Sequence, residues 1–495
     1  MLLFTRFRLP ALLSVGLFVA LLSSCKDSTP AVAPTPTTPT TPTTPAAPSQ
    51  VAQWLTMPDK SVLFARQKVS LVFAAATNSD PTIVVDTTQT FQTMDGFGYT
   101  LTGGSAYALS QMAASNRAAL LKELFAIDST SLGVSYLRIS IGASDLNDQV
   151  YTYDDMPGVQ TDPTLANFSL NADPTYFVPM LKEILAVNPA IKLLGSPWTA
   201  PSWMKSNNNS KGGSLLPQYY GAYAQYLVKY LQAMQAQGIT LDAITLQNEP
   251  LNPDNNPSMV MQGSEQATLV KNYVGPAFRA AGLATKIIAY DHNPDTAGIN
   301  FSNAILSDAA ASAYLDGIAY HLYAGSISAL GQIHQQYPTK NIYFTEQWIQ
   351  APGTTSFAGD LLWHVNNLVI GAPLNWSRNV LEWNLAADAA TSVHTPGGCT
   401  QCLGAVTIAG NTVTRNAAYY TIAHGSKFVR PGSVRVAATV PASAGLQTVA
   451  YKTPAGKRVL LVLNTGSVLQ KFNIQYKGKQ VSSSLYGGSV ATYVW

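Results

Sequence analysis

Residues 219–250 read YYGAYAQYLVKYLQAMQAQGITLDAITLQNEP, and their pattern is typical of an α/β fold. Apolar residues recur at helical spacing over 219–235, Gly238 ends that pattern, and 243–247 form a short apolar run of strand type. A helix that leads into a buried strand is one unit of an α/β fold with a parallel sheet.

The same alternation extends over residues 96–424. We expect eight strands, at 96–102, 134–141, 191–197, 243–247, 286–290, 316–322, 341–345 and 379–384. Helical patterns lie between them, for example at 117–125 and 176–187. Eight repeats of this kind predict an α/β protein with a (β/α)₈ TIM barrel. An open doubly wound sheet is the alternative, but its phosphate-binding patterns GxGxxG and GxxxxGK[ST] do not occur in the chain.

The segments on either side of the predicted barrel alternate as β structure does. Residues 51–95 and 425–495 contain runs such as Thr82-Ile-Val-Val-Asp and Arg458-Val-Leu-Leu-Val. We expect these N- and C-terminal β segments to form one side β-sandwich beside the catalytic barrel at 96–424.

The N-terminal 50 residues predict export. Residues 1–24 have a basic start and an apolar run at 11–22, which is too short for a permanent membrane helix. Leu22-Ser-Ser-Cys25 resembles a bacterial lipobox, which implies lipid attachment at Cys25; an ordinary signal peptide with an incidental cysteine is the alternative. Residues 25–50, rich in Thr and Pro, read as a linker. We therefore expect a monomeric lipoprotein at a bacterial cell surface or in the periplasm, in contact with the membrane only through Cys25.

The charge balance limits the kind of partner. Only 11% of the 495 residues are charged and the formal net charge is +3, so nothing in the composition favours nucleic-acid binding. Apart from Cys25, the cysteines are Cys399 and Cys402. In an oxidising compartment they predict a short disulfide, with a zinc half-site as the alternative.

Two glutamates are the candidate catalytic groups. The chain has six: Glu123, Glu183, Glu249, Glu265, Glu346 and Glu382. Glu249 and Glu346 follow predicted strands three repeats apart, so in a closed barrel they would face each other across the mouth where active sites are built. Opposed carboxylates are what glycosidic-bond hydrolysis needs. As alternatives, either could be a helix N-cap or a structural salt-bridge partner, but basic partners are scarce.

Aromatic residues gather at the same strand ends and suit a sugar ligand. They occur in Trp198-Thr-Ala-Pro-Ser-Trp203, in Tyr320-His-Leu-Tyr323, at Trp348 and at Trp383. Neither GxSxG nor HExxH occurs, which argues against an esterase or a zinc protease. No metal site and no cofactor are expected. A non-catalytic glycan-binding protein is the alternative from another class.

These motifs together resemble glycoside hydrolase family 30, the glucosylceramidase family. The resemblance rests on Gly96-Phe-Gly98, the segment 197–205, Gln247-Asn-Glu-Pro250, His321-Leu-Tyr323, Thr345-Glu346 and Trp383-Asn-Leu-Ala386. It implies that Glu249 is the general acid/base and Glu346 the nucleophile of a retaining β-glycosidase. It also implies a glucosyl subsite whose residues are Asp145, Trp198, Asn248, His321, Tyr323 and Trp383.

One departure bears on the substrate. Where many glucosylceramidases continue the first strand into a Thr-Asp pair, this chain has Leu101-Thr-Gly-Gly-Ser-Ala106. This segment, Asn375-Trp-Ser-Arg-Asn379 and the loop around Cys399 are more similar to the microbial β-1,6-glucanase branch. We therefore expect a β-1,6-glucan substrate, with glucosylceramidase, β-glucosidase or β-xylosidase activity as the alternative.

Overall fold

The computed structural model describes residues 50–76, 78–350 and 355–495. The predicted signal peptide, Cys25 and nearly all of the Thr/Pro linker lie outside the described residues. Within the described part, no helix is both long enough and apolar enough to cross a membrane.

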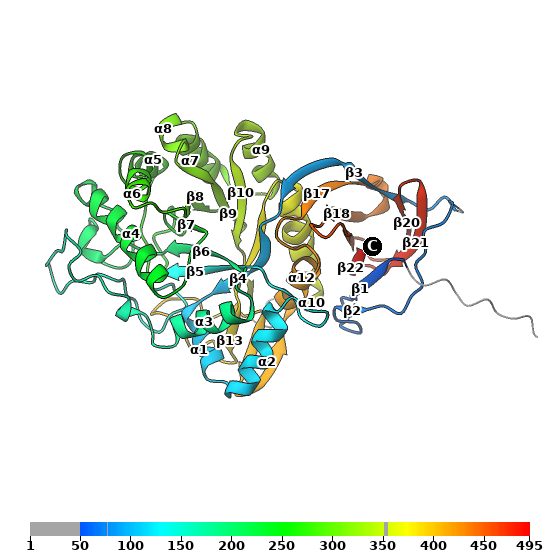
Figure 1. Ribbon diagram of the computed structural model, residues 1–495, viewed down its shortest axis with the longest axis horizontal. Coiled ribbons are helices and arrows are strands. Elements are labelled where there is room, and N and C mark those ends of the chain that lie inside the picture. Colours follow the sequence, from blue (N-terminus) through cyan, green and yellow to red (C-terminus); the bar gives the residue numbers. More distant parts are fainter. Residues whose placement is uncertain (1–49, 77, 351–354) are drawn as a thin grey trace, which may run out of the picture. The chain divides into compact units, whose positions relative to one another are not determined.

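Eight parallel strands form the barrel (Figure 1). They are β4 (Gly96–Leu101), β5 (Tyr136–Ile141), β6 (Lys192–Pro197), β7 (Ala243–Thr245), β8 (Lys286–His292), β9 (Leu315–His321), β10 (Asn341–Glu346) and β12 (Asn379–Asn384). β12 pairs with β4, and Arg378 N–H donates to Ile342 O at 2.9 Å where the two ends of the sheet meet. The predicted barrel is therefore confirmed, and each predicted strand end lies within two residues of the observed one.

The inside of the barrel has an apolar layer below a polar one. Alternate side chains from seven strands form the apolar layer: Tyr136, Leu194, Ala243, Ile288, Ala319, Tyr343 and Leu381. Nearer the carboxyl ends of the strands, Arg138 and Ser196 point inward instead, because strand side chains alternate with a period of two. The strand ends therefore hold the polar groups on a packed apolar base.

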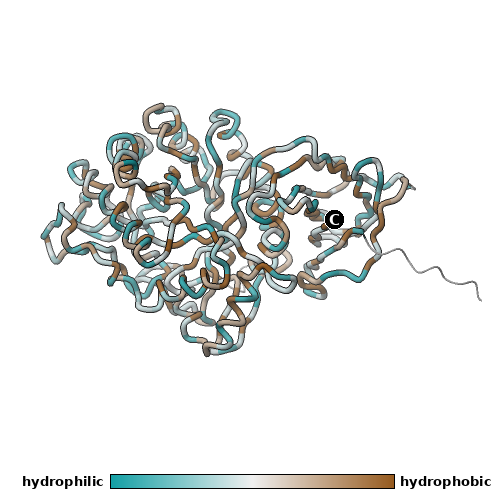
Figure 2. Tube along the Cα trace, in the orientation of Figure 1, coloured by the Kyte–Doolittle hydropathy of each residue, from teal (hydrophilic) through white to brown (hydrophobic). Residues whose placement is uncertain are grey.

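Helices surround the barrel. The α-helices of eight or more residues are α1 (Gly103–Ser110), α2 (Ala114–Phe125), α3 (Phe177–Val187), α4 (Tyr220–Ala236), α7 (Thr296–Leu306), α9 (Ser328–Gln336), α10 (Phe357–His364) and α12 (Ala417–Ser426). Apolar and polar positions alternate along them in Figure 2, as expected when one face packs against the strands.

Both ends of the described chain contribute to a second β structure. Its nine strands run in the order β2-β1-β22-β19-β18-β17-β3-β20-β21. β1 (Ala52–Thr56) pairs with β22 (Val490–Val494), and β3 (Thr82–Thr93) lies between β17 (Val434–Thr439) and β20 (Gln470–Tyr476). The predicted sandwich built from N- and C-terminal segments is therefore confirmed.

Candidate active site

Glu249 and Glu346 meet at the carboxyl ends of the barrel strands. Glu346 is the last residue of β10, and Glu249 follows β7 with a left-handed φ of 45°. The Glu249 N–H donates to Asp291 O at 2.9 Å, which supports this unusual backbone conformation. Both side chains are buried, and one carboxylate oxygen of each lies within 4.8 Å of the other and of a His321 ring nitrogen.

Each oxygen of Glu346 has a donor. Arg138 Nη1 donates to Oε2 at 2.5 Å, and the Tyr323 hydroxyl donates to Oε1 at 2.9 Å. His321 Nδ1 lies 3.6 Å from Oε1. The expectation that basic partners are scarce is therefore wrong for Glu346, because Arg138 is a fully buried cation in direct contact with it.

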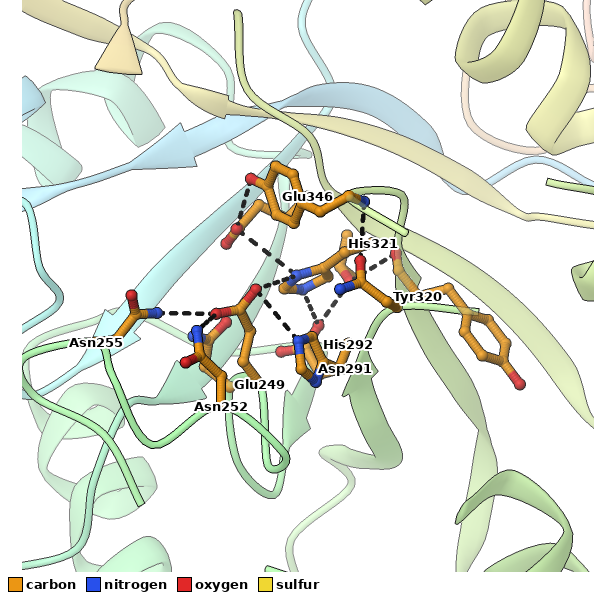
Figure 3. Close-up of polar contacts among 12 residues, drawn as sticks. Glu249, Asn252, Asn255, Asp291, His292, Tyr320, His321 and Glu346 are labelled. Carbon is orange, nitrogen blue, oxygen red and sulfur yellow. Dashed lines mark hydrogen bonds and ion pairs between the residues drawn. The ribbon is translucent and has the colours of Figure 1, made fainter. Parts of the chain in front are cut away.

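The two oxygens of Glu249 have different surroundings (Figure 3). The amides of Asn252 and Asn255 both donate to Oε2, each at 2.8 Å. His321 Nδ1 lies 3.4 Å from Oε1, and His292 Nε2 lies 3.7 Å from the same atom. Since Oε2 already accepts two N–H groups, Oε1 is the atom free to carry a proton.

Asp291, at the end of β8, is the centre of the network below the two glutamates. Its Oδ2 accepts from Arg138 Nη2 at 2.8 Å, and its Oδ1 lies 3.1 Å from His321 Nε2. Ser196, Thr245 and Thr345 donate their hydroxyls to the same carboxylate. Asp291 thus fixes both Arg138 and His321, two of the residues that contact the glutamates.

The charges in this network set the pKa values. Burial opposes the ionisation of Asp291, but the charge of Arg138 and the hydrogen bond from His321 hold its pKa well below the usual range. Burial lowers the pKa of His321, yet the charge of Glu346 and the hydrogen bonds to Asp291 and Glu249 outweigh this and raise it to about 9.

The two glutamates differ in pKa. Burial alone would raise the pKa of Glu249, but the hydrogen bond and charge of His321 lower it to about 2. Burial raises the pKa of Glu346 above its ordinary value, against the opposing charges of His321 and Arg138. Because Nε2 of His321 faces the ionised Asp291, that nitrogen carries one hydrogen, and the second proton of the imidazolium is on Nδ1, facing Glu249 and Glu346.

A cavity of about 310 Å³ opens above the two glutamates. The residues lining it are Asp145, Trp198, Glu249, Asn252, Asn255, His292, Asn293, Tyr323, Glu346, Trp348, Trp383, Cys399 and Cys402. The rings of Trp198 and Trp383 lie 5.5 Å apart, and the Arg138 guanidinium lies over the Trp198 ring at 4.7 Å. Two predicted subsite residues, Asn248 and His321, are buried and do not line the cavity.

The predicted subsite residues that line the cavity include one unusual acid. Burial and the charge of Glu346 raise the pKa of Asp145 to about 7. The Cys399 N–H points to the Asp145 Oδ2 at 3.4 Å.

Asn248 Oδ1 accepts from Arg138 Nη2 at 2.5 Å, so this amide is oriented by the same cation that contacts Glu346.

Sequence reasoning missed Arg138 and Asp291. Arg138 interrupts the apolar strand Tyr136-Leu-Arg-Ile-Ser-Ile141, and a charged residue inside a buried strand was the available signal. Asp291 ends an apolar run in Ile287-Ile-Ala-Tyr-Asp291 in the same way. Glu382 lies inside β12, two residues before its end; it does not line the cavity, and it contacts His364 Nδ1 at 2.8 Å.

The structure joins Cys399 and Cys402 in a disulfide with a Cα–Cα distance of 5.8 Å. Cys402 packs with Leu146, Trp198 and Trp383.

Within the described residues, Glu249, His321 and Glu346 form the one group of three side chains close enough to share a metal ion. Arg138 and the protonated His321 already supply positive charge there, so the group does not fit a cation well.

Comparison with known proteins identifies the family. The glycosyl hydrolase family 30 TIM-barrel model matches residues 94–429, and the family's β-sandwich model matches residues 432–493. An endo-1,6-β-D-glucanase of Trichoderma harzianum is 37% identical over 81% of this chain and 84% of its own length. The solved structure of the endo-β1,6-glucanase BT3312 is 38% identical, with a TM-score of 0.83 over 90% of this chain and 99% of that one. The mouse lysosomal acid glucosylceramidase is 27% identical over 86% of each chain. The chain therefore belongs to glycosyl hydrolase family 30.

Proposed function

We propose that this glycoside hydrolase cleaves β-1,6-linked glucan with retention of configuration. The observation that carries the proposal is the pair of opposed carboxylates within 4.8 Å in one cavity. Retaining enzymes place their carboxyl groups about 5 to 5.5 Å apart, whereas inverting enzymes need about 6.5 to 9.5 Å to admit a water molecule.

In the first step, an oxygen of Glu346 attacks the anomeric carbon. The bond from that carbon to the glycosidic oxygen breaks, and Glu249 Oε1 gives its proton to the leaving oxygen. Glu249 and His321 share this proton as one titrating pair, and His321 Nδ1 supplies it across the 3.4 Å contact. Proton transfer within the pair leaves both groups neutral; because the resting proton is on His321, the free energy of this transfer is part of the barrier of the first step.

In the second step, a water molecule attacks the anomeric carbon and releases Glu346. Glu249 takes the proton of that water and so acts as base. Arg138 stabilises the Glu346 carboxylate as it leaves, because its Nη1 already donates to Oε2. In this proposed mechanism Glu249 acts as the acid/base and Glu346 as the nucleophile, the roles that the family resemblance implies.

The walls of the cavity suit a glucosyl ring. Trp198 and Trp383 offer apolar faces to the C–H groups of the sugar, while Asp145 and Tyr323 offer hydrogen-bond partners to its hydroxyls. We propose that this is the subsite for the ring whose bond is cleaved. At neutral pH an uncharged or partly charged Asp145 can both donate to and accept from a sugar hydroxyl.

The similarity to endo-1,6-β-D-glucanases supports the linkage. Identity is 37% with the fungal glucanase and 27% with the mouse glucosylceramidase, over comparable shares of the chain. The test is a product assay with purified enzyme on β-1,6-glucan, β-1,3-glucan, an aryl β-xyloside and glucosylceramide. We expect release of gluco-oligosaccharides from the β-1,6-glucan with retained anomeric configuration by NMR; preferential cleavage of another substrate would refute the linkage.

We further propose that the enzyme is exported and tethered. Residues 1–24 would be removed before Cys25, and residues 25–50 would join the lipid anchor to a body made of segments 51–95, 96–424 and 425–495. The composition of the leader and the lipobox-like Leu22-Ser-Ser-Cys25 support this. Labelling with a fatty-acid analogue in a bacterial host, with Cys25→Ala as control, tests the anchor; its monomeric state stays a prediction.

A further inference from the structure

A second cavity adjoins the catalytic one at Trp348. Trp348 lines both the catalytic cavity and a neighbouring cavity of about 380 Å³, so it forms a shared wall. A third cavity, of about 360 Å³, has Gln350 and Asp360 in common with the second and is also lined by Phe357 and Tyr420. We call the second and third cavities together the aromatic groove, defined by Trp348, Asp360, Trp363, Phe357 and Tyr420.

The lining of the aromatic groove has the chemistry of a sugar-binding surface. Trp363, on α10, is 38% exposed, and it is the most exposed tryptophan of the described residues. At a cavity beside the catalytic one, an exposed indole offers a flat apolar face on which a sugar ring can stack. Gln347, Gln350 and Asp360 add polar groups, and the amide oxygen of Gln347 has no hydrogen-bond partner within the part of the chain that the structure describes.

The size of the catalytic cavity requires a polymer to continue elsewhere. At about 310 Å³ it lies at the small end of ligand pockets, so it accommodates the reacting ring but not several linked rings. A glucan chain that enters it must therefore leave over its rim. At Trp348 the catalytic cavity adjoins the second cavity, which has further aromatic and polar lining.

We infer that the aromatic groove binds further glucosyl units of the same β-glucan chain, with Trp363 as a stacking platform. This inference rests on the proposed function and specifies it: the enzyme prefers long chains and cleaves within them. Trp363 contributes to binding and not to the chemical step, because it lies outside the catalytic cavity.

The experiment compares substrates of increasing length in wild type and Trp363→Ala. The substrates are β-1,6-linked gluco-oligosaccharides of two to six units and an aryl β-glucoside. For the variant we expect KM on the five- and six-unit substrates to rise about tenfold, the effect of losing one ring-stacking contact. We expect kinetics on the aryl glucoside and on the disaccharide to stay within twofold of wild type. Trp363→Phe should recover most of the affinity, since it retains an aromatic face.

Tyr486→Ala is the matched control, because Tyr486 is an exposed aromatic that lines a separate cavity on the sandwich. It should leave KM unchanged at every length. Equal KM values for wild type and Trp363→Ala at all lengths would overturn the groove assignment, as would an equal loss on the aryl glucoside. If wild type cleaves no β-1,6 bond, the proposed linkage fails, and the same length series in the linkage that it does cleave tests the groove.

Discussion

Replacing Asp291 with Asn should disable catalysis through Arg138 and His321, neither of which the mutation changes. The carboxylate of Asp291 accepts from both of these charged groups and from three hydroxyls, and it is fully buried. An amide presents one acceptor and one donor where five donors converge. Arg138 and His321 would each lose a charge-assisted hydrogen bond of about 1.5 to 3 kcal/mol.

The magnitude for catalysis follows from these contacts. If either residue loses its position against the glutamates, a loss of about 1.5 to 3 kcal/mol corresponds to a fall in kcat of roughly tenfold to a hundredfold. The pH profile should move as well. Asp291 helps raise the pKa of His321 to about 9, so without it this pKa falls and the alkaline loss of activity begins at lower pH.

Asp95→Asn is the matched control. Asp95 is also a buried carboxylate, and it accepts from Lys192 at 2.8 Å and from Arg378 at 3.0 Å, but it lies just before β4 at the opposite end of the barrel. Both variants should lose a few kcal/mol of stability, because breaking a buried ion pair costs about 3 to 5 kcal/mol. The assay measures kcat and its pH dependence on an aryl β-glucoside, with thermal unfolding alongside. Equal stability losses with kcat and pH profile unchanged in Asp291→Asn would refute the positioning role.

Three further predictions concern the glutamates. Glu346→Gln should lower kcat at least about 10⁴-fold, because no nucleophile remains, while calorimetry should show that the variant still binds substrate. Persistent turnover in this variant would refute the nucleophile assignment. Wild-type kcat/KM should have a bell-shaped dependence on pH. It should rise as Glu346 ionises, above the ordinary glutamate pKa, and fall near pH 9 as the Glu249–His321 pair loses its proton. A flat profile between pH 4 and 10 would contradict this. The double variant Asn252→Ala/Asn255→Ala removes two hydrogen-bond donors from Glu249 Oε2, so the pKa of Glu249 should rise. For a substrate whose rate is limited by the second step, the acid limb of the kcat profile should then move to higher pH. An unchanged acid limb would show that these two donors do not set the pKa of Glu249.

Much of the barrel could be predicted from the sequence for a physical reason. Parallel strands buried on both faces read as continuous apolar runs, and Gly238 or Pro250 marks where a helix or strand ends. Glu249 and Glu346 could be placed at one mouth by counting repeats, because all strands of such a barrel run in the same direction. These features depend on local pattern alone.

The barrel, its sandwich, the two catalytic candidates and the family to which they point could thus be predicted from the residue pattern. The way in which the glutamates are held depends on long-range contacts: Arg138, Asp291 and His321 come from β5, β8 and β9, and their contacts span 30 to 208 positions of sequence. The tertiary structure also places Glu382 outside the cavity lining and Trp363 at the border of the groove beside Trp348. Such contacts depend on which strands lie opposite each other and which way their side chains point, and this is fixed only when the barrel closes.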